Sequence, residues 1–245
     1  MGLFIRFSIF RREGEAVITV VTPTYNRPRM LLRAIKSFLL QVTTEAKRMI
    51  IIDNGTTEDM DDVLHYIREH NLMKEVSYIR YEVNVNPNIR LNEGFEGRSV
   101  MTMLFDDDEF FDEHSLQMRC APIIHCQCDA TYSDWQDYGD KSGMHKTGEQ
   151  TLEDIKKRDC VGFGTMAWNA LTWSLCGPLH PDLWFQADWL FKIRVFEKIR
   201  IEYIPVPTMR YWWHPSQENQ RMTKADRERE NAIVFAELKK KGIEG

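Results

Sequence analysis

Four acidic residues in a row, Asp106–Glu109, follow the apolar segment Val100–Phe105. Neighbouring carboxylates repel one another, so such a run needs a divalent cation or the start of a helix to compensate its charge. Mg²⁺ and Mn²⁺ prefer hard oxygen ligands, usually take one or two protein carboxylates, and share the rest of their coordination shell with substrate phosphates. The run therefore indicates a metal site for a substrate that contains phosphate.

Two earlier polar segments also follow apolar ones. Thr22–Arg27 comes after Val17–Val21, and Asp53–Thr57 comes after Arg48–Ile52. Ligands of open α/β sheets bind at the carboxyl ends of the strands. The two polar segments are therefore expected to meet the acidic run at one edge of a sheet.

The elements that would position these residues alternate between strand and helix patterns, which indicates a mostly parallel sheet. Strands are expected at the three apolar segments named above, at Val76–Tyr81 and at Ala130–Asp137, and two further extended segments at Ile201–Ile204 and Thr208–Trp213. Apolar spacing and helix-start signals predict helices at Pro28–Gln41, Met60–His70, Glu113–Cys126, Thr151–Arg158, Ala187–Ile199 and Thr223–Lys241.

Composition narrows the class of protein. The chain of 245 residues is 43% hydrophobic and 28% charged, as expected of a globular chain with a full core. A net charge of −5 offers no bulk positive field, so a nucleic-acid acceptor is not excluded but would need a local groove. No apolar stretch approaches the roughly 20 residues that span a bilayer, so no integral membrane segment is expected. Five cysteines, an odd number, fit reduced thiols, and the protein is expected in the cytoplasm.

Three motifs in the same order resemble family 2 glycosyltransferases of the GT-A fold. They are residues 17–27 (VITVVTPTYNR), residues 50–59 (IIIDNGTTED), and Arg90 followed by Phe105–Asp108. The resemblance implies an α/β fold with a Rossmann-like nucleotide-binding half, a mostly parallel central sheet and an irregular acceptor half. Asn54, Leu91 and Glu109 depart from the usual family pattern.

Carried over residue by residue, the resemblance assigns a donor-binding site. It implies that Thr24, Tyr25 and Arg27 line the nucleotide pocket, that Asp53 hydrogen-bonds the base, most often uracil, and that Arg90 lies beside the nucleotide. The donor-binding segment continues with Asp106, on the ribose side, and Asp107. Asp108 would bind Mn²⁺ or Mg²⁺ on the diphosphate, and His214 would add a further contact to the metal or the diphosphate.

Transfer of a sugar to a hydroxyl also needs a base that takes the acceptor proton. In the resembled family this carboxylate begins a helix after a Gly-containing acceptor loop, and Gly177–Trp189 resembles that segment. Asp188 is the candidate catalytic base, and Asp182 is the competing carboxylate. Ala187 stands where the family commonly has Glu.

The expected organisation is a single GT-A domain at residues 16–220. Residues 16–110 would bind the nucleotide sugar and residues 111–220 the acceptor. Residues 1–15 would be an N-terminal extension, and residues 221–245 a C-terminal amphipathic helix. The apolar side of that helix is expected to carry Ala232, Ile233, Phe235 and Leu238.

The expected reaction is metal-dependent transfer of a hexose or pentose, with inversion, from a nucleoside-diphosphate donor, UDP-linked in the first instance, to an acceptor hydroxyl. Six tryptophans lie between residues 168 and 213, and aromatic faces stack on rings, so a ring-shaped acceptor is expected. Two alternatives stay open: a nucleotidyltransferase of similar fold, and a non-catalytic module that binds sugar nucleotides or glycans.

Overall fold

The computed structural model describes residues 18–96, 101–214 and 222–240. The expected N-terminal extension of residues 1–15 lies outside the described residues, as do Val17 and Val100, the expected first residues of two strands, and Lys241. Nearly all of the expected GT-A domain is therefore described.

Strands and helices alternate in the first half, as the sequence predicts. The elements are β1 (Ile18–Thr24), α1 (Pro28–Leu39), β2 (Lys47–Asp53), α2 (Asp61–Glu69), the short helix η1 (Leu72–Lys74), β3 (Val76–Arg80), α3 (Pro87–Phe95) and β4 (Met101–Leu104). The first turn of α1 begins with Pro28, where the missing N–H costs no helical hydrogen bond.

The second half is less regular. Its elements are β5 (Phe110–Phe111), α4 (Ser115–Ile124), β6 (Ala130–Gly139), β7 (Gly143–His145), α5 (Leu152–Lys157), η2 (Phe163–Thr165), β8 (Ala167–Asn169), α6 (Ala170–Cys176), α7 (Ala187–Lys198), β9 (Ile201–Trp213) and α8 (Lys224–Lys240). None of the helices in the described part of the chain combines the length and hydropathy that a membrane-spanning segment requires.

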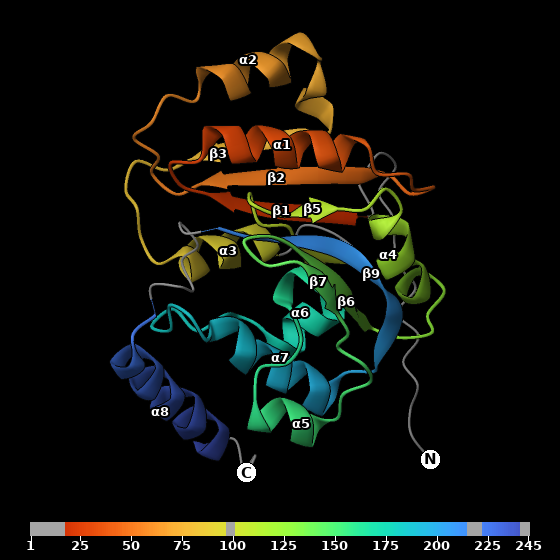
Figure 1. Ribbon diagram of the computed structural model, residues 1–245, viewed down its shortest axis with the longest axis vertical. Coiled ribbons are helices and arrows are strands. Elements are labelled where there is room, and N and C mark those ends of the chain that lie inside the picture. Colours follow the sequence, from red (N-terminus) through yellow and green to blue (C-terminus); the bar gives the residue numbers. More distant parts are fainter. Residues whose placement is uncertain (1–17, 97–100, 215–221, 241–245) are drawn as a thin grey trace.

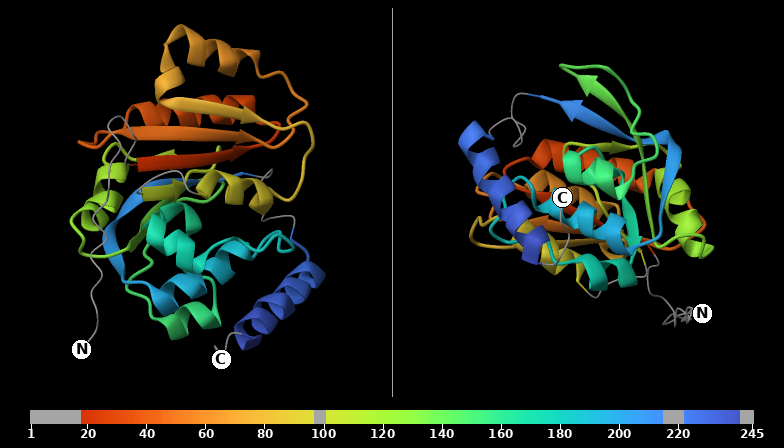
Figure 2. Two further views of the ribbon diagram at one scale, coloured as in Figure 1. Left: turned by 180° about the vertical axis from the view of Figure 1, so that it is seen from behind. Right: turned by 90° about the horizontal axis from the view of Figure 1, so that it is seen from below.

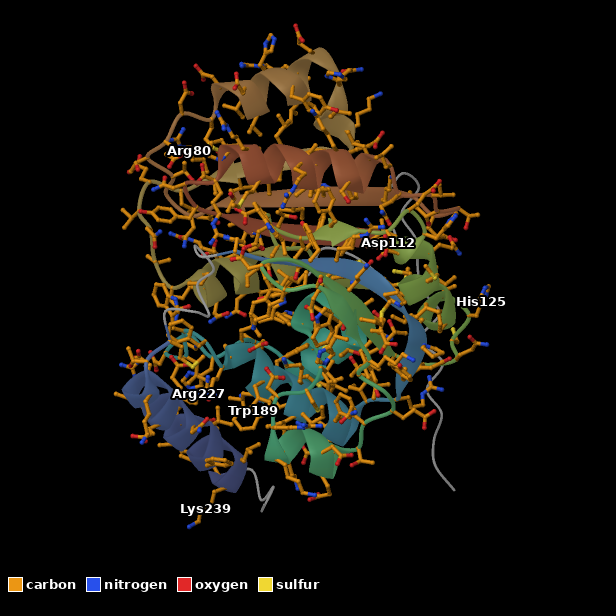
Figure 3. All side chains as sticks on the ribbon, in the orientation of Figure 1. Arg80, Asp112, His125, Trp189, Arg227 and Lys239 are labelled. Carbon is orange, nitrogen blue, oxygen red and sulfur yellow. The ribbon has the colours of Figure 1, made fainter. Side chains whose placement is uncertain are left out.

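One sheet runs through both halves in the order β3-β2-β1-β4-β8-β6-β9-β5, with β7 beside β6. β1, β2, β3 and β4 are parallel, which confirms the expected parallel sheet. Thr24 pairs with Asp53 and Asp53 pairs with Arg80, so these three strands end at one edge. The arrows of β1 and β2 point to that edge in Figure 1, and Arg80 lies there in Figure 3.

Two apolar clusters cover the two faces of this sheet. Ile18 and Val20 of β1 pack with α1, α2 and α4, whereas Val21 packs with α3, α6 and α7. Successive strand residues point to opposite faces, so buried residues on both sides produce the continuous apolar segments of the sequence. In Figure 1, α1 and α2 lie toward one end of the long axis and α5 to α8 toward the other.

The structure confirms that Ile201–Ile204 and Thr208–Trp213 are extended and joins them in one strand, β9. A bulge shifts its pairing with β6 between Ile204 and Pro207 and again between Pro207 and Arg210. Two prolines at or beside this bulge lack the N–H that regular pairing needs, so the strand continues past them. The hairpin of β6 and β7 projects at one edge of the molecule, and β9 runs below it (Figure 2, right).

The structure corrects the expectation about the apolar side of α8. Val234 and Leu238 are buried as part of the core, together with the carboxylate of Glu230, whereas Phe235 is 52% exposed and Ala232 is exposed. The buried residues follow an i, i+4, i+8 spacing, and one of them is charged. The charged Glu230 occupies one position of the buried face. A prediction that counts only apolar residues therefore selects a face rotated away from the buried one.

Candidate active site

The acidic run and the end of β1 are joined by direct contacts. The Asp107 carboxylate accepts hydrogen bonds from Thr24 Oγ1 at 2.7 Å and from Arg27 Nη1 at 3.0 Å. The same Arg27 nitrogen lies 3.0 Å from Asp108 Oδ2. The structure therefore brings together Thr24, Arg27 and the acidic run, residues about 80 positions apart in the chain.

His214 reaches the same carboxylate from the end of β9. Its Nε2 lies 3.0 Å from Asp108 Oδ2. Arg33 of α1 holds this end of β9, because its guanidinium stacks 4.3 Å from the ring centre of Phe110 and 4.4 Å from that of Trp212. Arg33 also donates to the backbone oxygen of Asp108 at 3.2 Å.

Burial and mutual repulsion act on the protons of the acidic run. Burial raises the pKa of Asp107 to about 6, with Arg27 opposing and Asp108 adding to the shift. Burial, followed by repulsion from Asp108, Asp107 and Asp188, raises the pKa of Asp106 well above its usual range. Glu109, with 2% of its surface exposed, has a similarly raised pKa from burial and from Asp106 and Asp108. Arg27 opposes the shift of Asp107 and Arg119 opposes that of Glu109, so these two arginines compensate only part of the charge.

Asp188 stands in the first turn of α7, as expected for the base. Its charge helps to raise the pKa of Asp106, so the two carboxylates lie within electrostatic range of one another. Its carboxylate also contacts Lys192, one helical turn further on, at 2.8 Å. The competing Asp182 is exposed in the loop before α7, where its backbone N–H donates to His180 Nδ1. Of the two carboxylates, Asp188 is the one whose charge contributes to the raised pKa of Asp106.

Asp53 ends β2 and is completely buried. Its Oδ1 accepts the backbone N–H of Thr56 at 2.8 Å, and its Oδ2 accepts the hydroxyl of Tyr78. Arg80 lies 3.6 Å from Asp53 and has a half-exposed side chain. A base that binds at this end of the sheet would therefore meet Tyr78 and Arg80 before it reaches the Asp53 carboxylate.

The remaining two predicted donor-binding residues flank this region. Tyr25 follows β1 with 42% of its surface exposed. Arg90 lies on α3, where its guanidinium stacks 3.6 Å from the ring centre of Tyr81 and pairs with Glu93 at 3.1 Å. Tyr81 connects this pair to the site, because its backbone N–H donates to the Asp53 backbone oxygen.

The loop after β1 is held against the loop after β2. Asn26 adopts a left-handed conformation with φ of 53°, which asparagine tolerates better than most residues. Its Oδ1 accepts the backbone N–H groups of Thr57 and Glu58, and its own N–H donates to Thr56 Oγ1. These bonds fix the backbone on which Tyr25 and Arg27 stand.

The loop before α7 is held from two sides. Asn86, Asn88 and Asn92 of the α3 region hydrogen-bond to backbone groups of residues 179–183. Glu230 of α8, fully buried, accepts the backbone N–H groups of the next three residues, Trp184, Phe185 and Gln186, at 2.9 to 3.0 Å. The start of α7, and with it Asp188, is thus placed by elements from both halves.

The donor atoms around Asp108 fit a divalent cation that shares its shell with phosphate oxygens. A carboxylate oxygen and an imidazole nitrogen lie 3.0 Å apart, and Mn²⁺ accepts both ligand types. Among the residues that the structure describes, no group of three or more His, Cys, Asp or Glu side chains is arranged to hold a metal. A cation here would need oxygen ligands from a substrate, as Mg²⁺ and Mn²⁺ sites on nucleotides do.

Six positions near the site are absent from the sequence-based prediction. Tyr78 and Arg80 lie on the predicted strand beside β2, where a residue that pairs with the Asp53 strand could have been considered. Lys192 stands i+4 from Asp188, a spacing that could have suggested the contact. Arg33, Asp159 and Glu230 reach the site region only through the tertiary fold, and no motif in the sequence marks them.

Comparison with solved structures gives the class of protein. The fold matches S. aureus TarS residues 1–349 in complex with UDP, with a TM-score of 0.67 at 15% identity over 81% of this chain and 61% of that chain. It also matches the mannosyltransferase PcManGT from Pyrobaculum calidifontis in complex with GDP-Man and Mn²⁺, with a TM-score of 0.67 at 12% identity over 92% of this chain and 65% of that chain. The chain has the GT-A fold of glycosyltransferases.

Sequence comparison gives the family. Residues 19–178 match Glycosyl transferase family 2, and the chain belongs to this family. The match ends before Asp188 and His214, so it covers the donor-binding motifs and stops short of the proposed base. The expected fold and family are both confirmed.

Curated relatives match over shorter stretches. The GalNAc(5)-diNAcBac-PP-undecaprenol β-1,3-glucosyltransferase of Campylobacter jejuni is 34% identical over 98 residues, which is 38% of this chain and 30% of that protein. An uncharacterized glycosyltransferase of Rickettsia bellii is 28% identical over 106 residues, which is 43% of this chain and 15% of that protein. The matches thus span 30% or less of these relatives' length.

Proposed function

We propose that this protein transfers a sugar from a nucleoside-diphosphate donor to an acceptor hydroxyl, with inversion at the anomeric carbon and with the help of Mn²⁺ or Mg²⁺. The observation that carries the proposal is the contact between Asp108 of the acidic run and His214, with Asp188, at the start of α7, within electrostatic range of Asp106. A diphosphate-binding cation site and a base must face one another for such a transfer. Membership of family 2 supports the same activity.

In the proposed reaction, the acceptor oxygen attacks the anomeric carbon and Asp188 takes the hydroxyl proton. The bond between the anomeric carbon and the diphosphate oxygen breaks, and its electron pair leaves with the diphosphate. Attack from the face opposite the leaving group inverts the anomeric carbon. A divalent cation bound by Asp108 and His214 would neutralise charge on the departing diphosphate.

The residues of this chain supply binding and orientation. Arg27 carries a positive charge beside Asp107 and Asp108 and is placed to share it with a diphosphate. Thr24 fixes the Asp107 carboxylate, so that Arg27 has a rigid partner. Asp188 projects from the first turn of a buried helix, which limits its movement.

UDP is the donor nucleotide that we propose, with Asp53, Tyr78 and Arg80 at the base. The support is the resemblance of the Asp53 motif to uracil-binding members and the UDP and UDP-GlcNAc complexes of TarS. PcManGT is bound to GDP-Man, so the fold by itself accommodates either nucleotide. For the acceptor we propose a molecule with a sugar-like ring, because Trp184 exposes 38% of its surface in the loop that leads to Asp188.

Two variants separate metal binding from proton transfer. Asp108→Ala should weaken Mn²⁺-dependent UDP binding at least tenfold, about 1.4 kcal/mol, because the cation loses its protein carboxylate. Asp188→Asn should keep UDP affinity and lose sugar transfer, because the amide takes up no proton. Titration calorimetry with UDP and Mn²⁺ measures the first effect, and UDP release from UDP-sugars measures the second.

Asp182→Asn is the matched control, since it changes the neighbouring exposed carboxylate and should leave both measurements unchanged. Equal UDP affinity in wild type and Asp108→Ala would refute the metal assignment. UDP release from no UDP- or GDP-sugar, by a protein that still binds UDP, would favour the non-catalytic binding module.

A further inference from the structure

Lys192 is a buried ammonium inside an otherwise apolar stretch of α7. Its side chain is 1% exposed, and Leu190, Phe191 and Ile193 around it are buried in the core. Burying a charge is costly unless every hydrogen of the group finds a partner. An apolar residue at this position would pack in the core as its neighbours do, so packing does not explain why a lysine stands here.

All three hydrogens of this ammonium have an acceptor. The Lys192 Nζ lies 2.6 Å from Asp159 Oδ1, 2.8 Å from Asp188 Oδ2 and 2.8 Å from the backbone oxygen of Val161. Asp159 and Val161 belong to the segment between α5 and η2, whereas Asp188 and Lys192 are one turn apart on α7. Lys192 therefore ties the carboxylate of the proposed base to a second carboxylate from a distant segment.

The charges around Asp188 oppose one another. On one side stands Asp106, whose own pKa is raised by burial and by its acidic neighbours, including Asp188. On the other side stands Lys192. Burial opposes the charge of Lys192, but the two carboxylates outweigh burial and raise its pKa, so it remains charged through the neutral range. Lys192 is thus the cation that contacts the Asp188 carboxylate directly.

Asp159 competes for the same cation. Burial raises the pKa of Asp159 to about 6, with Lys192 opposing this shift and Asp188 adding to it. The 2.6 Å contact with Asp159 is shorter than the 2.8 Å contact with Asp188. The charge of one ammonium is thus divided between two carboxylates.

We propose that Lys192 and Asp159 are positioning residues for the catalytic base: Lys192 holds the Asp188 carboxylate in place, and Asp159 shares the ammonium and limits how strongly it does so. This inference rests on the proposed function, in which Asp188 accepts the acceptor proton. A base that is held too firmly by a cation takes up a proton poorly, and one that is held too weakly is already protonated. The pair sets a balance between these two limits.

The other charged groups on elements packed against the start of α7 have partners of their own. Lys156 of α5 contacts Glu153, Asp154 of α5 caps its own helix through Thr151, and Glu230 of α8 accepts backbone N–H groups. Arg158 and Cys160 flank Asp159 in the chain and contribute to the same local field. Lys192 contacts Asp188 directly, and Asp106 and Asp159 are the acidic groups whose pKa values its charge raises.

Two substitutions should move the pH dependence of the reaction in opposite directions. Lys192→Met removes the cation and should shift the acidic limb of the kcat profile upward by about one pH unit or more. Asp159→Asn removes the competitor and should shift this limb downward by about half a pH unit. The KM for the donor should stay within about twofold in both variants, because neither residue contacts the donor-binding residues.

The assay is UDP release from UDP-GlcNAc with Mn²⁺ and water as acceptor, followed from about pH 5 to about pH 9. The same shifts should be visible without turnover in the ¹³C signals of labelled aspartate carboxyls. The Asp188 signal in that spectrum is the one that Asp188→Asn removes. Lys198→Met, exposed at the end of α7, and Asp182→Asn are the matched controls, and neither should move the acidic limb.

Uniform loss of kcat at every pH, with no shift in either variant, would overturn the inference and leave Lys192 with a structural role only. Asp159→Asn decides the question by itself if Lys192→Met fails to fold. Sugar transfer that survives in Asp188→Asn would instead refute the proposed base, and this failure is distinguishable because it needs neither Lys192 nor Asp159 to be changed.

Discussion

At the scale of single residues, the acidic run shows how the protein manages four adjacent carboxylates without neutralising each one. Arg27 pairs with Asp107 and Asp108, and Thr24 donates to Asp107. Asp106 and Glu109 have raised pKa values from burial and from their neighbours, so protons replace ion pairs there. The contribution of the acidic run to the free energy of unfolding therefore depends on pH.

This pH dependence leads to a prediction for Glu109. Its folded-state pKa lies well above the ordinary value of 4.5, so above about pH 4.5 the folded state holds a proton that the unfolded state has released. Glu109 therefore favours folding at low pH, and this contribution falls as pH rises, by up to about 1.4 kcal/mol per pH unit. Glu109→Gln removes the titration, so its stability should fall less than that of wild type between about pH 5 and about pH 8.

Urea unfolding at several pH values in EDTA measures this difference, because EDTA removes any cation that would compensate the run. Glu113→Gln, which changes an exposed glutamate four residues further on, should follow the wild-type pH dependence. An equal or steeper fall of stability in Glu109→Gln would contradict the raised pKa of Glu109.

At the scale of elements, the loop before α7 is the part of the site that depends most on its neighbours. Asparagines of α3 hold its first part, and Glu230 of α8 holds residues 184–186. α8 therefore does more than cover the core, because its buried carboxylate accepts hydrogen bonds from backbone N–H groups that would otherwise have no acceptor. Trp189 and Phe235 add an edge-to-face ring contact between α7 and α8, in the region where Figure 3 shows Trp189.

Removal of this carboxylate should be costly. Glu230→Ala leaves three backbone donors without their acceptor and opens a cavity, so the free energy of unfolding should fall by about 2–4 kcal/mol. Urea unfolding measures the loss. Glu228→Ala, on the same helix with a side chain 68% exposed, is the control and should stay within about 0.5 kcal/mol of wild type. A loss of similar size in both variants would refute the special role of Glu230.

At the scale of the whole molecule, the candidate site lies where the two halves meet. Asp108 follows the parallel strands of the first half, whereas His214 ends β9 and Asp188 begins α7 in the second. Arg33 connects the halves, because it projects from α1 and stacks on both Phe110 and Trp212. The position of His214 thus depends on an arginine of the first half.

This connection can be tested through binding. Arg33→Met keeps the aliphatic stem and removes the two stacking contacts, so Mn²⁺-dependent UDP affinity should fall by about threefold to tenfold. Titration calorimetry measures the change, and Arg29→Met, exposed on the same helix, should leave the affinity unchanged. Wild-type affinity in Arg33→Met would show that His214 holds its position without the stacking of Arg33 on Phe110 and Trp212.

Local patterns explain which parts of the fold were predictable. The four parallel strands and the helices α1, α2, α4, α5 and α7 follow from apolar periodicity and helix-start residues, and the structure confirms them within a few positions at their ends. α3, α6, β5, β7 and β8 are short, interrupted or lack a clear period, so no pattern in the sequence predicts them. The continuity of β9 is not predictable either, since its bulge at two prolines is accommodated only by pairing with β6.

The sequence by itself determined which polar groups stand at the ends of the parallel strands. These groups come together because the carboxyl ends of parallel strands meet at one edge of a sheet, whatever their side chains are. This accounts for Thr24, Asp53 and the acidic run. Only the tertiary structure decided which charges face one another: Arg27 between two aspartates, Tyr78 on Asp53, and Lys192 between Asp159 and Asp188. Electrostatic interactions depend on separation in space and on burial, and neither quantity is contained in the spacing of residues along a chain.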